Sequence, residues 1–222
     1  LYNRSKSAFQ TNASRYFKKL KKDGINTIYF HVVPCNDAIY PSKYLKWSSY
    51  MFESAPDYDP LEILVETAHK NNMTLHAWLN PYRKKMGVSY NPGAASSLNR
   101  INRIVKEIIT NYDVDGIQFD DYFYPTEDEN FDKKQYQAYI EKYGKENSMR
   151  LDNWRMQNVN TLICKVYRTI KSVDSSIEFG ISPQGNIGNN DGLYADVKSW
   201  CTCKGFADYI CPQIYFSLEN PA

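Results

Sequence analysis

Five short stretches of the chain are almost continuously apolar and rich in β-branched and aromatic residues. They are NTIYFHVV (26–33), MTLHAWL (73–79), VDGIQFD (114–120), IEFGIS (177–182) and DYICPQIYF (208–216). Because apolar and polar positions do not alternate in them, they are typical of strands buried on both faces of a parallel sheet. The pattern therefore predicts five such strands.

Between these strands the apolar residues recur at helical spacing. Residues 6–22, 97–110 and 151–171 each carry an apolar stripe every three or four positions. Another helix starts at Asp59-Pro60, where an Asp cap precedes a proline at the first helical position and Glu62 follows in the first turn. Segment 184–207 shows no clear helical pattern. Alternation of strands and helices predicts an α/β fold with a parallel sheet.

The loops after the strands separate a barrel from a doubly wound sheet. Long polar and aromatic loops follow residues 33, 79 and 120, as on the carboxyl-terminal face of a (β/α)8 TIM barrel. No Gly-rich phosphate loop follows any strand, which argues against a nucleotide-binding sheet. A closed barrel has eight strands and about 250 residues. We therefore predict one domain, 1–222, that is an incomplete barrel of strands two to six, truncated at both ends.

Composition narrows the possible partners. The 27 basic and 25 acidic residues are interspersed and give a net charge of +2, so nucleic acid is not an expected partner. No apolar run approaches the roughly 20 residues of a membrane span. Five cysteines form neither a disulfide framework nor a zinc-site spacing. We expect buried free thiols, with a pairing of Cys201 or Cys203 with Cys211 as the alternative.

Polar residues follow every predicted strand, at the end where a barrel presents its active site. In chain order they are Asn36, Asp37, Tyr40, Asn80, Tyr82, Arg83, Asp120, Asp121, Tyr122, Tyr124, Ser182, Gln184, Asn186, Gln213 and Tyr215, and His76 lies within the third barrel strand, 73–79. Their convergence predicts a polar cleft with aromatic walls. The 19 tyrosines fit either sugar stacking in this cleft or ordinary packing.

Asp120 and Asp121 are the main catalytic candidates. Two adjacent carboxylates after a buried run are costly unless they are solvated, paired or coordinated, and strand neighbours point to opposite faces, so one of them faces the barrel axis. Glycoside cleavage needs one protonated carboxyl and a second base or nucleophile, and crowding of like charges would separate these roles. Alternatively, Asp121 caps the loop, or both are structural.

Several further residues have two possible roles. Asp37 is either catalytic or a turn former, and Arg83 binds either a substrate carboxylate or a loop acid. His76 and His31 belong either to the site or to the core, whereas His69 is expected to have no function. No metal-ligand spacing supports a site made of Asp37, His76, Asp120 and Asp121, and no G-x-S-x-G elbow is present. We predict no metal and no cofactor.

Five strings in this chain resemble the bacterial glycosyl-hydrolase-like family 10. They are PCNDAIYPS, DYDPLEILVETAHKNNMTLHAWLNPYR, YDVDGIQFDDYFYP, FGISPQG and DYICPQIYF, and the resemblance runs from about Gly24 to Phe216. The family includes a divisome-associated glycosidase that acts on denuded peptidoglycan. The resemblance implies a TIM-barrel glycosidase, exported to the cell envelope and often lipidated, with a leader segment outside this chain.

Carried over position by position, the resemblance places Asp120 and Asp121 in the catalytic motif. It places Asp37, His76, Asn80, Arg83, Asn158, Ser182, Gln213 and Tyr215 around the cleft. This chain departs from the family at Val33, where an Arg is usual. The fourth-strand motif is also distantly similar to the chitinase signature, but Tyr122 stands where the acid Glu would fall and Gln118 where an Asp would, so that mechanism is not carried over.

The sequence thus predicts a glycoside hydrolase acting on an amino-sugar polymer, with peptidoglycan glycan strands as the expected polysaccharide. The expected catalytic residues are Asp120, Asp121 and Asp37. The expected substrate-binding residues are Asn36, Tyr40, His76, Asn80, Tyr82, Arg83, Tyr122, Tyr124, Asn158, Ser182, Gln184, Gln213 and Tyr215. The retaining or inverting outcome, which follows from a carboxyl separation of about 5–5.5 Å or about 6.5–9.5 Å, and the oligomeric state stay open.

Two other classes of function are also compatible with the sequence. One is a non-catalytic glycan-binding barrel of the cell envelope, which would use Tyr40, Trp47, Tyr82, Tyr122 and Tyr124 as stacking platforms. The other is a metal enzyme similar to polysaccharide deacetylases.

Overall fold

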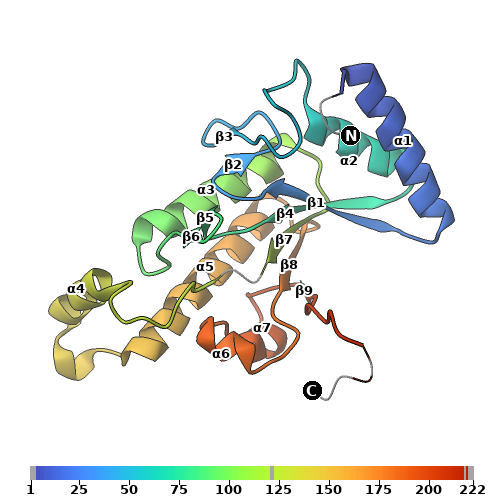
Figure 1. Cartoon of the computed structure of the whole chain (residues 1–222). Helices are drawn as coiled ribbons and strands as arrows, with labels where there is room; N and C mark the ends of the chain where they lie inside the picture. The colour runs from blue at the N-terminus through green and yellow to red at the C-terminus, as the bar shows by residue number, and fades with distance from the viewer. Residues whose placement is uncertain (1–3, 121–122, 218, 220–222) are drawn as a thin grey trace.

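Five parallel strands form the central sheet of the computed structural model, which describes residues 4–120, 123–217 and 219 (Figure 1). They are β1 (Thr27–Val33), β4 (Thr74–Leu79), β7 (Gly116–Asp120), β8 (Glu178–Ser182) and β9 (Tyr209–Ile210). Their order in the sheet equals their order in the chain. This is the order of a barrel wall, whereas a doubly wound sheet reverses direction at a switch point.

The strand direction turns strongly across the sheet, from β1 to β8 (Figure 1). Within the described residues the sheet stays open, with β1 and β9 as its edges. All five predicted strands are confirmed, although the fifth is only two residues long and is extended by an isolated bridge between Gln184 and Gln213. The α/β barrel architecture predicted from the sequence is confirmed in this incomplete form.

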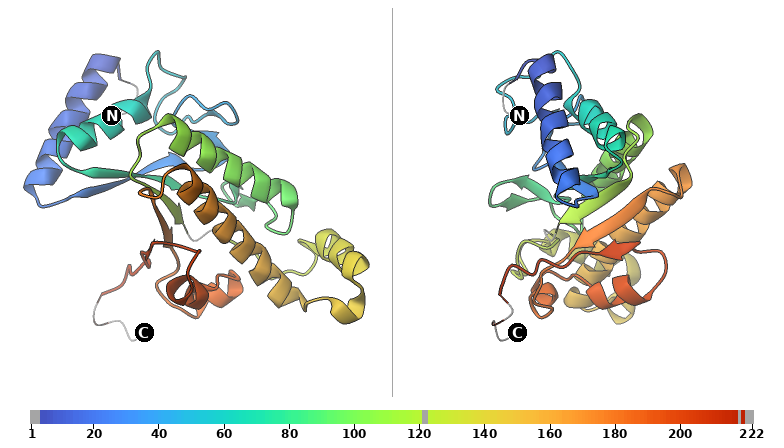
Figure 2. Two further views of the ribbon diagram at one scale, coloured as in Figure 1. Left: turned by 180° about the vertical axis from the view of Figure 1, so that it is seen from behind. Right: turned by 90° about the vertical axis from the view of Figure 1, so that its right-hand side faces the viewer.

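Four long helices cover one face of the sheet: α1 (Lys6–Lys22), α2 (Pro60–Lys70), α3 (Ala95–Asn111) and α5 (Leu151–Val173). Helices α3 and α5 lie behind the sheet in Figure 1 and in front of it in Figure 2, left. The predicted cap is present, because Oδ1 of Asp59 accepts hydrogen bonds from the backbone N–H groups of Leu61 (2.9 Å) and Glu62 (3.2 Å). These four helices match the sequence prediction closely.

The two faces of β7 separate the core from the site. Ile117 and Phe119 are buried in the hydrophobic core, which also contains apolar residues of the helices. Gln118 and Asp120 alternate with them and therefore point to the opposite, inner face of the sheet. The same alternation continues on the neighbouring strands, so the inner face presents a row of polar and aromatic side chains.

The remaining elements are short and were not predicted. They are β2 (Asp37–Ala38), β3 (Lys46–Trp47), β5 (Arg83–Lys85), β6 (Val88–Ser89), α4 (Lys133–Tyr143), a 3-10 helix (Lys145–Asn147), α6 (Asn189–Gly192) and α7 (Val197–Thr202). Helix α4 buries no side chain fully, so its apolar stripe is weak. Helices α6 and α7 are too short for a periodic pattern.

The cysteines are free thiols, and one part of the expectation about them is wrong. Cys35 is buried and Cys164 half-buried, but Cys201, Cys203 and Cys211 are exposed. The first two of these three lie at the end of the surface helix α7, and Cys211 follows the edge strand β9. Within the described ranges, no helix is both long and apolar enough to cross a membrane.

Candidate active site

Asp120 ends β7 at the carboxyl edge of the sheet and is buried there. Its Oδ1 accepts a hydrogen bond of 2.6 Å from Nε2 of Gln213, and the same amide donates to the backbone oxygen of Ser182 at 3.2 Å. Ser182 is also the sheet partner of Asp120. One side chain that follows the edge strand β9 therefore ties together the ends of β7 and β8.

A cavity of about 150 Å3 opens beside Asp120 on the inner face. It is lined by Tyr29, Trp78, Gln118, Asp120, Ser182, Cys211, Gln213 and Tyr215. The structure thus brings together four residues expected at the site and adds four that the sequence analysis left out. Two of these, Trp78 and Gln118, could have been predicted from the sequence. Trp78 lies two residues before Asn80 and Gln118 two residues before Asp120, and strand residues two apart point to the same face.

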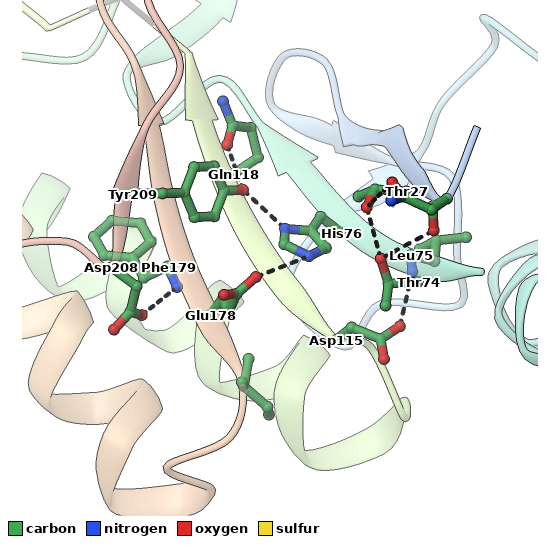
Figure 3. Close-up of polar contacts among 12 residues, drawn as sticks. Thr27, Thr74, Leu75, His76, Asp115, Gln118, Glu178, Phe179, Asp208 and Tyr209 are labelled. Carbon is green, nitrogen blue, oxygen red and sulfur yellow. Dashed lines mark hydrogen bonds and ion pairs between the residues drawn. The ribbon is translucent and has the colours of Figure 1, made fainter. Parts of the chain in front are cut away.

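The floor below this cavity is a hydrogen-bonded layer, shown in Figure 3. The Tyr209 hydroxyl donates to Oε1 of Gln118 (2.7 Å) and lies 2.8 Å from Nδ1 of His76. Nε2 of His76 lies 3.6 Å from a carboxylate oxygen of Glu178. Burial lowers the pKa of His76, although Glu178 and Asp115 act in the opposite direction. The prediction that His76 contacts substrate is therefore not supported: its ring is a buried, hydrogen-bonded part of the inner layer.

His31 supports the cavity from β1. Its ring stacks on Trp78 with centroids 4.0 Å apart and planes 8° apart. Burial lowers the pKa of His31 to about 4, against the opposing charge of Asp120. The imidazole is therefore neutral near pH 7.

Asn80 lies next to this stacked pair at the end of β4. Its Nδ2 donates to the backbone oxygen of Pro34 at 3.0 Å. Its Oδ1 and Nε2 of His31 are buried without a hydrogen-bond partner among the described residues. A polar pair without partners, close to Asp120, is a place where substrate or water could bind.

The predicted site residues that follow β1 do not line the cavity beside Asp120. Oδ1 of Asp37 accepts the Cys35 backbone N–H at 3.1 Å, which is the turn-forming role. The Asn36 side chain is engaged by Arg100 of α3. Tyr40 is buried and donates to Glu107 at 3.0 Å. The expectation that Tyr40 contacts substrate is wrong for this structure, because its ring packs between the loop and α3.

Tyr82 and Tyr124 are also core residues, each 0% exposed. The Tyr124 ring meets Tyr194 edge-on at 5.1 Å. The hydroxyls of Tyr82 and Tyr124 and Nδ2 of Asn158 are buried without a hydrogen-bond partner in the described part of the chain. The prediction of Tyr82 as a sugar-contacting side chain is therefore corrected, because it lies in the core. Tyr124 is buried too, but it lines the cavity under the β5–β6 hairpin that is described below.

A buried ion pair holds those loops in place. Arg155 of α5 bonds both carboxylate oxygens of Asp132, at 2.8 and 2.7 Å, and both side chains are fully buried. Arg155 also donates to the backbone oxygens of Glu127 and Asp128 and to the Tyr194 hydroxyl. One guanidinium thus fixes the loop between β7 and α4 against the segment that follows β8.

A second cavity, of about 340 Å3, lies under the β5–β6 hairpin. Its lining includes Arg83, Lys85, Ser89, Tyr124 and Gln184. Arg83 and Lys85 give it a cationic wall. Arg83 and Gln184 from the sequence prediction thus meet here rather than in the cavity beside Asp120.

Two predicted site residues, Asp121 and Tyr122, lie outside the described residues. Across the part of the chain that the structure describes, no three His, Cys, Asp or Glu side chains are grouped so that they could hold a metal ion.

The chain belongs to the family described as glycosyl hydrolase-like 10, which it matches over residues 3–89 and 83–221. It is 34% identical to glycosyl hydrolase YngK of Bacillus subtilis (strain 168) over 247 positions, covering 90% of this chain and 48% of that protein. It is 35% identical to glycosyl hydrolase DigH of Escherichia coli (strain K12) over 257 positions, covering 91% of this chain and 57% of that protein. The chain therefore spans about half the length of these relatives.

The two family matches overlap at residues 83–89, the β5–β6 hairpin. The alignment with the Bacillus relative is 247 positions long, although it takes in 90% of a chain of 222 residues. The relative therefore carries several tens of residues that this chain lacks.

Solved structures support the fold. The glycoside hydrolase domain of PgaB (BpsB) from Bordetella bronchiseptica matches with a TM-score of 0.62 and 10% identity, covering 95% of this chain and 70% of that one. Alpha-L-fucosidase isoenzyme 2 from Paenibacillus thiaminolyticus matches with a TM-score of 0.56 and 16% identity, covering 81% of this chain and 31% of that one. At these identities the likeness concerns the fold alone.

Proposed function

We propose that the protein is a glycoside hydrolase that cleaves an amino-sugar polymer, with peptidoglycan glycan strands as its substrate. The observation that carries this proposal is the position of Asp120, a carboxylate at the carboxyl end of a central strand, beside a cavity and held by an amide N–H at 2.6 Å. Active sites of barrel enzymes lie at this edge. Membership in a family of named glycosyl hydrolases supports the same reaction class.

Asp120 is suited to be the base or nucleophile of this reaction. The N–H of Gln213 donates to Oδ1 and orients the carboxylate beside the cavity. The general acid would be Asp121 or Asp37. Asp37 keeps one carboxylate oxygen that no turn hydrogen bond uses.

The cationic wall under the β5–β6 hairpin supports an anionic polymer. Peptide-free peptidoglycan strands carry a lactyl carboxylate on every second sugar. Arg83 and Lys85 line a cavity of about 340 Å3 in which such a carboxylate could bind. A neutral glycan would gain nothing from these charges.

The decisive experiment measures release of sugar fragments from peptide-free peptidoglycan strands by the full-length protein and its variants. Asp120→Asn should lower kcat by about a thousandfold or more, within the range expected for loss of carboxylate catalysis, with an unchanged melting temperature. Asp113→Asn is the matched control, because that side chain is 94% exposed and precedes the amino end of β7, whereas Asp120 lies at its carboxyl end. Undiminished cleavage by Asp120→Asn would overturn the mechanism.

The structure offers fewer stacking surfaces than the non-catalytic glycan-binding alternative requires. Three of its five stacking platforms, Tyr40, Tyr82 and Tyr124, are buried. Binding of glycan strands by the wild-type protein without any cleavage would nevertheless favour it over hydrolysis. We further propose action in the cell envelope, which fractionation of cells that express the full-length protein would test.

A further inference from the structure

Two glycines on the inner face let aromatic rings from neighbouring strands lie flat across the sheet. A Cβ at Gly116 would come within 2.3 Å of Nδ1 of His76, and a Cβ at Gly180 within 1.9 Å of the Tyr209 ring. The rings of His76 and Tyr209 therefore occupy the space above β7 and β8 and meet over β7 (Figure 3). Their meeting point is the Tyr209 hydroxyl.

This arrangement orients the side-chain amide of Gln118. The Tyr209 hydroxyl has one hydrogen and donates it to Oε1 of Gln118, which can only accept. Nδ1 of His76 lies 2.8 Å from the same hydroxyl and donates to it when the ring carries a proton on this nitrogen. With its oxygen held toward the floor, the amide directs its NH2 group away from Tyr209.

Among the described residues, that NH2 group has no hydrogen-bond acceptor. Gln118 is only 5% exposed, and no described residue accepts a hydrogen bond from its Nε2. The side chain lines the cavity of about 150 Å3 beside Asp120. Buried polar groups in proteins are nearly always hydrogen-bonded, so we expect this donor to bind a ligand or a water molecule in the cavity.

The cavity has the size and chemistry for a small substituent. Its volume equals the liquid volume of about five water molecules, enough for a group of a few heavy atoms. Trp78 and Cys211 contribute apolar wall beside the polar Gln118. A small group that carries both a carbonyl oxygen and a methyl fits a cavity with one polar donor and an apolar wall.

We propose that this cavity binds the 2-acetamido group of an N-acetylhexosamine, with Nε2 of Gln118 donating to the acetamido oxygen and the methyl packing on Trp78. The inference rests on the proposed function, since it names the sugar at the same site. Gln118 is thus a specificity-determining residue, and Tyr209 and His76 are positioning residues that orient it.

The spacing along β7 agrees with this assignment. Residues two apart on one face of a strand are separated by about 6.6 Å, so Gln118 and Asp120 are neighbours on the inner face. The C-2 substituent of a hexosamine is on the ring carbon next to the anomeric carbon. One sugar ring can therefore present its acetamido group to Gln118 while its glycosidic bond lies near Asp120.

The test compares two neutral β-1,4-linked tetramers, tetra-N-acetylchitotetraose and cellotetraose, which differ in the 2-substituent. Binding is measured by calorimetry with the full-length protein carrying Asp120→Asn, so that turnover does not interfere. This protein should bind the acetylated tetramer about tenfold more tightly, as expected for one otherwise unsatisfied hydrogen bond. Equal affinity, or no binding of either, would overturn the proposal.

Adding Gln118→Leu to this protein should bring the two affinities within about twofold of each other. Gln137→Leu is the matched control on the exposed face of α4 and should keep the full preference. Because Gln118→Leu replaces a buried side chain, its affinity for cellotetraose serves as the internal check of folding. Tyr209→Phe, which removes only the orienting hydroxyl, should weaken the preference in the same direction. A preference that survives both variants would contradict the assignment.

Failure of this inference can be told apart from failure of the proposed function. A protein that prefers the acetylated tetramer but cleaves no glycan strand supports the acetamido cavity and overturns hydrolysis. A protein that cleaves glycan strands but does not discriminate between the tetramers overturns the cavity assignment alone.

Discussion

Nε2 of Gln213 lies 2.6 Å from Oδ1 of Asp120, and the two residues are 93 positions apart in the chain. The contact joins the end of β7 to the segment after the edge strand β9. The orientation of the candidate catalytic carboxylate therefore depends on the strand at the open edge of the sheet. Whatever stabilises that edge also positions Asp120.

Loss of this contact should reduce catalysis more than stability. Gln213→Leu removes this donor, so Asp120 loses one of the contacts that orient it, and we expect kcat to fall by up to about a hundredfold, the order expected for a misplaced catalytic group, with little change in KM. Gln157→Leu, at an exposed position of α5, is the control. Steady-state kinetics on peptide-free glycan strands measure both parameters. Equal kcat values for Gln213→Leu and wild type would contradict a positioning role.

The buried pair of Arg155 and Asp132 should dominate the stability of the rim loops. Arg155→Met leaves a buried carboxylate unpaired and should cost about 3–5 kcal/mol of unfolding free energy. Arg155→Lys should recover little, because lysine cannot reproduce the two parallel hydrogen bonds. Urea unfolding measures both.

The buried pair is compared with the exposed ion pair of Lys70 and Glu66, in which Nζ lies 2.9 Å from Oε2. Lys70→Met should change stability by less than about 0.5 kcal/mol, since exposed helix pairs contribute little. Similar losses for Arg155→Met and Lys70→Met would show that burial of the first pair is energetically unimportant.

Stability should decrease as the pH falls from about 6.5 to about 4. Burial lowers the pKa of His31 to about 4, so in this range the unfolded imidazole binds a proton that the folded one does not. Unfolding is thereby favoured at the acidic end. At about 1.4 kcal/mol per pKa unit, the contribution is on the order of 3 kcal/mol.

Urea unfolding at pH 7 and pH 4.5 tests this for wild type and His31→Gln. Carboxylates titrate in both proteins and cancel in the comparison, so the variant should lose less stability on acidification. The same loss in both proteins would exclude His31 as the source.

Gly180 should tolerate no side chain. The Cβ of Gly180→Ala would lie 1.9 Å from the Tyr209 ring, so the ring must move away from Gln118. We expect a loss of about 1–3 kcal/mol, as for overpacked interiors, and Tyr209→Ala in the same chain should restore part of it. Gly188→Ala is the control, since its nearest neighbour is 3.4 Å away. Thermal unfolding should show a lowered melting temperature for Gly180→Ala and an unchanged one for Gly188→Ala.

Chelation separates hydrolysis by carboxylates from a metal-dependent deacetylase. Cleavage of glycan strands should be unchanged after dialysis against EDTA, because the proposed mechanism uses only protein carboxylates. Loss of activity on chelation and its return with a divalent ion would favour the metal enzyme.

Much of the fold was predictable because its determinants are local. Continuous apolar runs mark β4 and β7, and the Asp59 cap starts α2 as expected. The position of Asp120 followed from the same logic, since a polar residue after a buried strand lies at the sheet edge. Helix α4 escaped prediction because it buries no side chain fully and its sequence carries no strong stripe.

The directions of loop side chains were not predictable. Tyr40, Tyr82 and Tyr124 follow strand ends and looked like cleft walls, yet all three are buried. Nothing in their neighbouring residues reports which helix will pack on them. For Gln118 the sequence predicts a strand position on the inner face. Only the contact with Tyr209, 91 positions away, shows that its amide is held in one orientation.

The sequence by itself determined the α/β class, the five parallel strands, the four long helices and the edge of the sheet at which Asp120 lies. These features depend on hydrophobic periodicity and capping, which act over a few neighbouring residues. Only the tertiary structure decided that Gln213 holds Asp120, that Tyr209 orients the Gln118 amide and that Tyr82 and Tyr124 are buried. Each of these depends on contacts between side chains from distant parts of the chain, which no local pattern encodes.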